Sequence, residues 1–226
     1  EALAGVNAAL LCIWDLCKGT DPVLEITDVA LLTKTGGKSG VWINPEQPIP
    51  DWVLQQLPSS TPLVDRKIAV LVMSDRASQG EYEDESGQYL VSAMTAQGAD
   101  VCAYRVIPDE FAQIQEAIQA ISETHDPHVI LCTGGTGPGP RDVTPLALQT
   151  LLNPELPGLG EWLRSESAVY TKTAWLSRMG GGLVGRALLI TLPGSLQAVK
   201  ECVGIFIEGL PKAIVMIEKQ GRKGRL

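Results

Sequence analysis

One stretch of the sequence decides the fold: residues 129–145 read VILCTGGTGPGPRDVTP. The apolar, partly β-branched residues at its start favour a buried strand, and the glycines after them favour a sharp turn. Thr144 and Pro145 are typical of the N-cap and first residue of a helix. The stretch therefore predicts a strand, a glycine-rich loop and a helix in succession.

Such a loop is suited to bind an anion. Its backbone N–H groups approach a ligand closely, and the positive end of the following helix favours negative charge. Asp142 would repel a bare phosphate, so its presence indicates a divalent cation between the two. The glycines alone are weak support, because no Gly-Lys-Ser/Thr closes the loop and Pro140 replaces the third small residue of a dinucleotide fingerprint. A tight connection without a ligand remains the alternative.

Composition limits the class of protein. The 226 residues, 45% hydrophobic with mean hydropathy +0.10, are enough for one good-sized core and a partial second unit. A net charge of −8 argues against nucleic acid or an anionic membrane as partner. The five cysteines form no C-x-x-C pair and only two histidines are present, so the sequence offers no set of ligands for a zinc site. This cysteine usage indicates a reduced, cytoplasmic protein. We find no signal peptide or membrane-length apolar run, and a start at Glu1 suggests a fragment or processed product.

The first part of the chain predicts a small α+β module. Apolar residues recur every three or four positions over residues 2–18, which predicts an amphipathic helix with a solvated Asp15–Lys18 ion pair. Residues 25–33 favour a strand. The following Gly-Lys-Ser is not a P-loop, because Leu32 stands where that motif needs glycine. Five prolines in residues 41–66 then predict an extended linker without helix or sheet.

From residue 67 onward, strands and helices alternate. Apolar runs at 68–73, 101–107, 129–133 and 187–192 predict strands, and helical patterns follow them at 86–97, 114–121, 145–152 and after residue 195. We expect residues 180–182 to be a flexible glycine segment and 220–226 a frayed basic tail. This alternation predicts a three-layer α/β fold, a mostly parallel sheet with helices on both faces, preceded by the partial α+β module and the proline-rich linker.

Four of the predicted strands end in polar or glycine-rich segments, at 74–75, 109–110, 133–142 and 193–195. Ligands of open α/β sheets bind beyond the carboxyl ends of the strands, so we expect one shared site. Asp109 and Asp142 could hold Mg²⁺ against a triphosphate, while amides of 134–137 and of the Gly194-Ser195 turn bind phosphate oxygens. The sequence therefore predicts nucleotidyl transfer.

Residues 67–219 also resemble the molybdopterin adenylyltransferase family. The shared motifs are SDRAS at 74–78, IPDE at 107–110, TGGTGPGPRDVTP at 133–145, PGLGE at 157–161, LSR at 176–178 and LPGS at 192–195. The resemblance implies transfer of AMP from ATP, with Mg²⁺, to the terminal phosphate of molybdopterin and release of pyrophosphate. It also implies an α/β fold, small-molecule substrates without nucleic acid or membrane, and a homotrimer or higher homo-oligomer.

The resemblance assigns roles to individual residues. Asp109, Asp142 and Ser177 correspond to catalytic positions, and the first two also to the metal site. Ser195 stands where many members have asparagine. The positions implied to bind nucleotide or pterin are Ser74, Asp75, Gly134, Gly135, Thr136, Gly137, Arg141, Arg178, Pro193, Gly194 and Ser195. Two alternatives stay open: the Ser177 hydroxyl only caps a turn, or the domain is a pterin carrier or molybdenum-insertion domain without adenylylation.

Residues 1–42 resemble a second family of the same pathway, cyclic pyranopterin monophosphate synthase. The match comprises EAL at 1–3, IWDLCK at 13–18 and KTGGKSG at 34–40, and it implies a catalytic acid at Asp15 and functional roles for Lys18 and Glu1. Only about the last third of that domain is matched, so we expect the chain as given to lack that activity. We predict a bifunctional fusion: module 1–42, linker 43–66, adenylyltransferase domain 67–219 and tail 220–226. Alternatively, residues 1–66 serve only in assembly.

Overall fold

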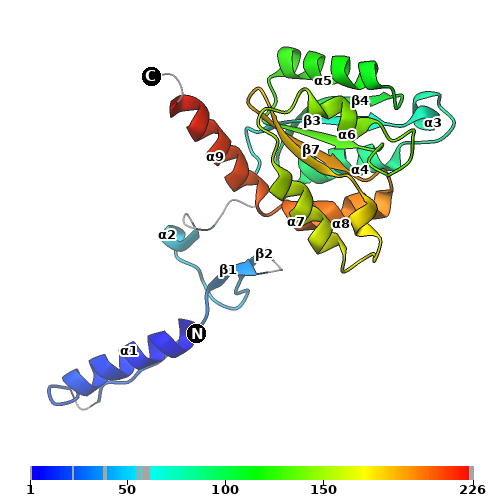
Figure 1. Ribbon diagram of the computed structural model, residues 1–226. Helices are drawn as coiled ribbons and strands as arrows, with labels where there is room; N and C mark the ends of the chain where they lie inside the picture. The colour runs from blue at the N-terminus through cyan, green and yellow to red at the C-terminus, as the bar shows by residue number, and fades with distance from the viewer. Residues whose placement is uncertain (1, 22, 38–39, 55–56, 58–61, 224–226) are drawn as a thin grey trace. The chain divides into compact units, whose positions relative to one another are not determined.

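The computed structural model describes residues 2–21, 23–37, 40–54, 57 and 62–223. The chain divides into two compact units, Glu1–Ser60 and Thr61–Leu226, and each is described by itself (Figure 1).

The first unit contains little regular structure. Helix α1 spans Ala2–Cys17, strands β1 (Thr33–Gly37) and β2 (Gly40–Ile43) pair antiparallel, and α2 (Asp51–Leu54) is a single turn. The strand expected at 25–33 is wrong, because Asp28 has φ 54° and interrupts the extended chain. The linker is also not free of helix: the carbonyl of Pro50 accepts the N–H groups of α2 residues, a role that needs no N–H from proline.

The second unit is built on one five-stranded sheet. The strands are β3 (Lys67–Met73), β4 (Asp100–Ile107), β5 (Val129–Thr133), β6 (Gly180–Val184) and β7 (Ala187–Leu192). Their order is β4-β3-β5-β7-β6, and only the edge strand β6 runs antiparallel to its neighbour. The mostly parallel sheet predicted from the sequence is thus confirmed.

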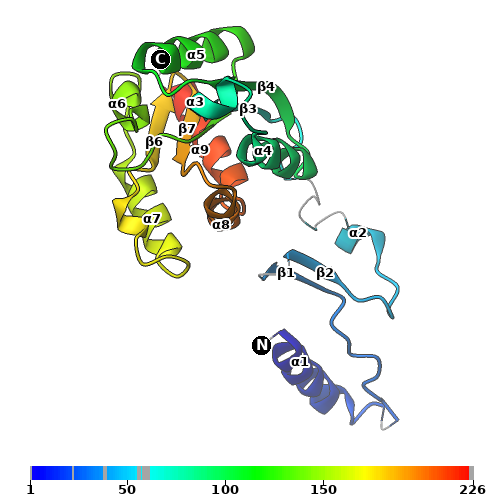
Figure 2. The same cartoon turned by 90° about the vertical axis from the view of Figure 1, so that its right-hand side faces the viewer.

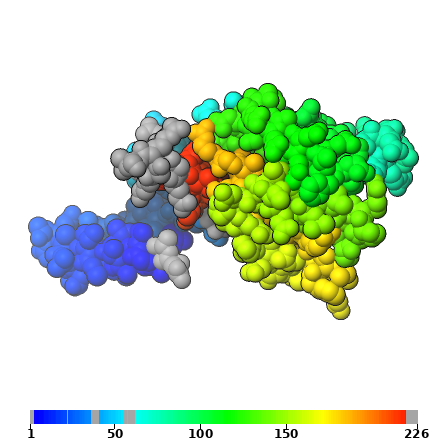
Figure 3. Space-filling view, turned by 45° about the horizontal axis from the view of Figure 1, so that its top comes forward, coloured from blue at the N-terminus to red at the C-terminus, as the bar shows by residue number. Residues whose placement is uncertain are grey.

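Helices cover both faces of this sheet (Figures 1 and 2). Side chains of α5 (Phe111–His125) and α6 (Thr144–Gln149) pack on one face with alternate β3 residues Ala69, Leu71 and Met73. The intervening residues Ile68, Val70 and Val72 face the other core. That core receives α4 (Glu85–Ala96), α7 (Pro157–Ser167), α8 (Leu196–Phe206) and α9 (Leu210–Lys223). A strand apolar on both faces therefore lies at the centre of three layers, as expected. In Figure 3 the green side chains of α5 form the outer surface of one layer.

Two expectations for this unit are wrong. The glycines at 180–182 belong to strand β6 rather than to a flexible segment, because a Cβ at Gly181 would lie 2.0 Å from the carbonyl oxygen of Leu189 and glycine permits that close pairing. Helix α9 continues to Lys223, so the beginning of the basic tail is helical. Residues 224–226 of the tail lie outside the described residues. In the described part of the chain, every helix is too short or too polar to cross a membrane.

Candidate functional site

The loops that follow four parallel strands meet at one edge of the sheet. The N–H of Ser74, after β3, donates to the carbonyl of Ile107 at the end of β4 (2.9 Å). The Thr133 hydroxyl, at the end of β5, donates to the carbonyl of Pro193 after β7 (2.7 Å). The N–H of Gly134 likewise donates to Leu192 (3.2 Å). These hydrogen bonds join the segments in two pairs, the loop after β3 to the end of β4 and the loop after β5 to the end of β7, at the carboxyl edge of the sheet.

Asp75 organises the charges at this edge. It begins the one-turn helix α3 (Asp75–Ser78), and its Oδ1 accepts the N–H of Asp109 at 3.0 Å. The Arg141 guanidinium forms an ion pair with Oδ2 of Asp75 and lies 3.6 Å from Oε1 of Glu110. The Arg141 hydrogen bond, followed by that from Asp109, holds the pKa of Asp75 below its ordinary value. Asp75 is therefore ionised and committed to these partners.

Asp109 is in a different electrostatic position. Its side chain is half-buried, and burial, followed by repulsion from Asp75 and Asp142, raises its pKa to about 6. Its Oδ1 has no hydrogen-bond partner among the described residues, and neither has the buried Oγ1 of Thr144. A Cβ at Gly135 would lie 2.6 Å from Oδ1 of Asp109 and 2.3 Å from Oγ1 of Thr144, so both atoms converge beside this glycine. Buried polar atoms without partners indicate a place for a missing ligand or cation.

Asp142 flanks the same loop. Its Oδ2 accepts the N–H of Gly139 at 2.9 Å, and a Cβ at Gly137 would lie 2.8 Å from that oxygen. Within the ranges that the structure describes, no three His, Cys, Asp or Glu side chains gather as a ready-made metal cage. Mg²⁺ usually takes only one or two carboxylates, with phosphate oxygens and water completing its shell. Asp109, which lacks a partner at Oδ1, and Asp142 fit that requirement.

Ser177 and Arg178 attach a distant segment to this loop. The two hydroxyls of Thr136 and Ser177 lie 3.3 Å apart. The N–H of Arg178 donates to the carbonyl of Thr136 (2.7 Å), and its side chain donates to the carbonyls of Gly137 (2.9 Å) and Asp142. Arg178 thus holds the loop in place. The Ser177 hydroxyl contacts Thr136 across the site rather than the short helix η1 (Ala174–Leu176) that precedes it.

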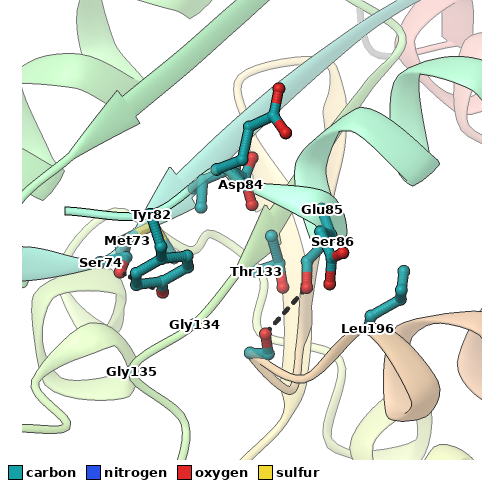
Figure 4. Close-up of a pocket in the computed structure, with 13 residues that line it drawn as sticks. Met73, Ser74, Tyr82, Asp84, Glu85, Ser86, Thr133, Gly134, Gly135 and Leu196 are labelled. Atoms are coloured by element: carbon teal, nitrogen blue, oxygen red, sulfur yellow. Dashed lines mark hydrogen bonds between the residues drawn. The ribbon is translucent and has the colours of Figure 1, made fainter. Parts of the chain in front are cut away.

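A first hollow, of about 310 Å³, lies on one side of the loop (Figure 4). The Ser86 hydroxyl points at the glycine turn after β7 and donates to the carbonyl of Gly194 at 2.9 Å. The ring of Tyr82 lies beside Ser74, with 2.8 Å between their hydroxyl oxygens. Asp84 caps α4 and accepts the hydroxyl of Tyr104 at 2.7 Å. Three consecutive acids, Glu83 to Glu85, give this hollow a negative rim.

A second hollow, of about 440 Å³, has a different lining. Leu148, Leu152 and Leu156 supply apolar surface. Its other lining side chains include Trp175, Ser177, Glu155, Glu161, Arg164 and Arg178. The loop joins the two hollows, because Gly135 lines the first while its neighbour Thr136 contacts Ser177 of the second. The predicted shared site therefore consists of two hollows connected by the glycine-rich loop.

Some sequence-predicted residues have other positions. Glu1 lies outside the described residues. Asp15 and Lys18 belong to the first unit, where they form an exposed ion pair with each other. Ser195 is exposed and caps α8 by accepting the N–H of Ala198 at 3.4 Å.

The expected capping role of Thr144 is wrong. Val143 occupies the N-cap position of α6, and the Thr144 hydroxyl turns into the site instead. Because Pro145 fixes the first turn without a side-chain cap, this hydroxyl is available for other contacts.

Sequence reasoning missed several residues of the two hollows: Tyr82, Asp84, Ser86, Glu161 and Trp175. Asp84 offered a signal, since an aspartate directly before a helical pattern is typical of an N-cap. Trp175 offered none, because its position depends on how η1 packs.

Two family models match the chain. The one described as a probable molybdopterin binding domain matches residues 69–212, and the MoaC family matches residues 1–37. A relative from Synechococcus elongatus, a molybdenum cofactor biosynthesis bifunctional protein, is 39% identical over 96% of this chain, which spans 66% of the relative's length. A molybdopterin adenylyltransferase of Helicobacter pylori is 34% identical over 66% of this chain and 86% of its own length.

Solved structures agree with these matches. The molybdopterin biosynthesis enzyme MoaB of Thermus thermophilus superposes with a TM-score of 0.63 at 33% identity, over 67% of this chain and 96% of that one.

Proposed function

The chain belongs to the family of probable molybdopterin binding domains of molybdenum cofactor biosynthesis, and from this premise we propose that it is a molybdopterin adenylyltransferase. An oxygen of the terminal phosphate of molybdopterin attacks the α-phosphorus of ATP. The bond from that phosphorus to the bridging oxygen breaks, and pyrophosphate leaves. The products are adenylylated molybdopterin and pyrophosphate.

Each hollow suits one half of this reaction. The negative rim of the first, Glu83 to Glu85, provides acceptors for ribose hydroxyls, while the second offers apolar surface, an indole and two arginines to an anionic pterin. The glycine-rich loop between them provides backbone N–H groups for the reacting phosphates. Transfer of this kind asks the protein mainly for positioning and charge stabilisation.

Asp109 and Asp142 are the residues that would hold Mg²⁺ in this arrangement. The observation that carries the proposal is the Oδ1 of Asp109, which is buried and without a partner in the described ranges, beside the same glycine-rich loop that Asp142 contacts. A bound Mg²⁺ would neutralise phosphate charge. Ser177, held against Thr136, would orient the phosphate of molybdopterin as it enters from the second hollow.

The alternative is a pterin carrier or molybdenum-insertion domain without adenylylation. Such a domain binds pterin but has no need of paired carboxylates at a phosphate loop. The test is pyrophosphate release from ATP and Mg²⁺ with and without molybdopterin. We expect release only when molybdopterin is present. Molybdopterin binding without any pyrophosphate would support the carrier and reject the transferase.

We further propose that residues 1–37 are part of a MoaC-family module in a bifunctional protein, like the relative that carries that description. The whole protein would then also form cyclic pyranopterin monophosphate, with Asp15 as acid.

We propose the cytoplasm as the compartment, where ATP is available. A homotrimer is proposed as the assembly, with exposed apolar side chains such as Val169 and Tyr170 as contact candidates; light scattering of the purified chain tests it.

A further inference from the structure

Trp175 is a large aromatic side chain that the core does not use. It lies in η1 with 71% of its surface exposed, and it lines the second hollow. The preceding Ala174 is buried and anchors the turn, so the indole projects from a fixed support. Isolated exposed apolar residues are common on protein surfaces, but one at the wall of a hollow with charged groups offers a binding face.

The surroundings of Trp175 define the kind of ligand. Leucine side chains give the hollow apolar surface, while Glu155 and Glu161 provide carboxylate acceptors and Arg164 and Arg178 provide positive charge. A flat heteroaromatic ring with N–H donors on its edge and an anionic substituent satisfies all of these groups together. The aromatic ring of the first hollow, Tyr82, instead has its hydroxyl bonded to Ser74 and stands beside three acids.

Trp175 lies close in the sequence to the residue proposed to bind the phosphate of the ligand. Only Leu176 separates Trp175 from Ser177, whose hydroxyl lies 3.3 Å from that of Thr136 on the phosphate loop. A ligand whose ring lies on Trp175 can therefore place its terminal phosphate at Ser177 and the loop.

We propose that Trp175 is a specificity-determining residue that stacks on the pterin ring of the substrate and so selects a pterin for the second hollow. This inference rests on the proposed function for the identity of the ring. Trp175 takes no part in bond making or breaking; it binds the ring and sets the position from which the phosphate reaches the α-phosphorus of ATP.

The test compares Trp175→Ala with Trp162→Ala in the full chain. Trp162 is a matched control, because it is also an exposed tryptophan (42%) of the same region but is not a lining residue of the second hollow. Loss of one stacking partner weakens binding by about tenfold or more. We therefore expect Trp175→Ala to raise KM for molybdopterin at least tenfold with KM for ATP unchanged, Trp175→Phe to recover most of the loss, and Trp162→Ala to match the unmodified chain.

A second measurement does not depend on turnover. Binding of 6-hydroxymethylpterin, which lacks both dithiolene and phosphate, is followed by its own fluorescence in the absence of ATP. We expect the unmodified chain and Trp162→Ala to bind it alike, Trp175→Ala to bind at least tenfold more weakly, and adenosine not to compete. Equal binding by Trp175→Ala, competition by adenosine, or no binding to the unmodified chain would each overturn the inference. Failure of pyrophosphate release with intact pterin binding would instead reject the adenylyltransferase assignment and leave the stacking role standing.

Discussion

The backbone N–H of Asp109 donates to the carboxylate of Asp75 at 3.0 Å, so two acids from successive strand ends are fixed beside one another. Asp75 forms an ion pair with Arg141, whereas Asp109 keeps an unpartnered oxygen, as judged over the described residues. The same contact that positions Asp109 thus also exposes it to the charge of Asp75. Two acids held this close repel each other, and the cation of the proposed function would relieve that repulsion.

The raised pKa of Asp109 predicts the pH dependence of the reaction. Its pKa is about 6, because burial and then the charges of Asp75 and Asp142 disfavour the ionised form. Below pH 6 the carboxyl group is protonated and cannot attract a cation, so kcat/KM falls by about tenfold per pH unit on the acid side. A pH–rate profile of pyrophosphate release at a fixed, subsaturating Mg²⁺ concentration measures this fall, and a rate that stays flat to pH 4.5 would contradict the role of Asp109.

Protonation of Asp109 should lower activity without unfolding the protein. A carboxyl group whose pKa is higher in the folded than in the unfolded state contributes stability at low pH and loses it as pH rises through the folded value. Acidification through pH 6 therefore favours the fold as far as this group is concerned. Circular dichroism at pH 5.5 should still report the folded protein.

Replacement of Arg141 should move the acid limb to higher pH. The guanidinium lowers the pKa of both Asp75 and Asp109, and without it Asp75 stays ionised at pH 6 and repels Asp109 unopposed. Arg141→Ala should therefore shift the midpoint of the profile upward. Arg186→Ala is the control, because this arginine pairs with Asp126 at the opposite edge of the sheet. If the two variants have the same midpoint, the charge coupling at the site is refuted.

Gly135 should tolerate no side chain. Its φ is +62°, and a Cβ would lie within 2.6 Å of both Asp109 and Thr144. We expect Gly135→Ala to lower the free energy of unfolding by about 1–3 kcal/mol and to abolish turnover. Gly204, in α8, has no heavy atom within 4 Å of an added Cβ, so Gly204→Ala should be neutral or stabilising by about 0.4–1 kcal/mol. Denaturant melts and pyrophosphate assays compare the two variants. Full activity in Gly135→Ala would show that the reaction does not need the close approach of Asp109 and Thr144 to Gly135.

Removal of residues 1–60 should leave adenylylation intact. The second unit has its own core on both sheet faces, and all residues proposed for the reaction belong to it. We expect residues 61–226 to release pyrophosphate at a rate within about twofold of the whole chain, because the second unit contains every residue proposed for this reaction. A changed oligomer with unchanged turnover would favour the view that residues 1–66 serve assembly, whereas a lost turnover would place part of the site in the first unit.

Much of the second unit was predictable because its signals are local. Strand β3 is apolar on both faces, and that run alone indicates a central strand of a parallel sheet. The polar segments after each strand followed from the same topology, which brought Asp75, Asp109 and Asp142 to one edge. The roles assigned to these residues remain proposals.

Other features depend on packing that no local pattern carries. The glycines of β6 look flexible in sequence, yet they pair with strand β7. The backbone of Leu189 lies so close to Gly181 that only a residue without a side chain fits there. Thr144 reads as a cap, although its hydroxyl lies beside Gly135 and has no hydrogen-bond partner among the described residues. The division into two hollows, with Trp175 in one of them, likewise arises from tertiary structure.

The most direct measurement of the central claim is molybdopterin-dependent pyrophosphate release by Asp142→Asn, with Asp126→Asn as the matched control. Asp126 caps α5 in a left-handed conformation that asparagine also adopts, and it pairs only with Arg186 in the described part of the chain. We predict that Asp142→Asn lowers the rate by about 100-fold or more, the cost expected for losing one stabilising group of the transition state, while Asp126→Asn leaves it unchanged. An Asp142→Asn rate equal to that of the unmodified chain would contradict adenylyl transfer at this site.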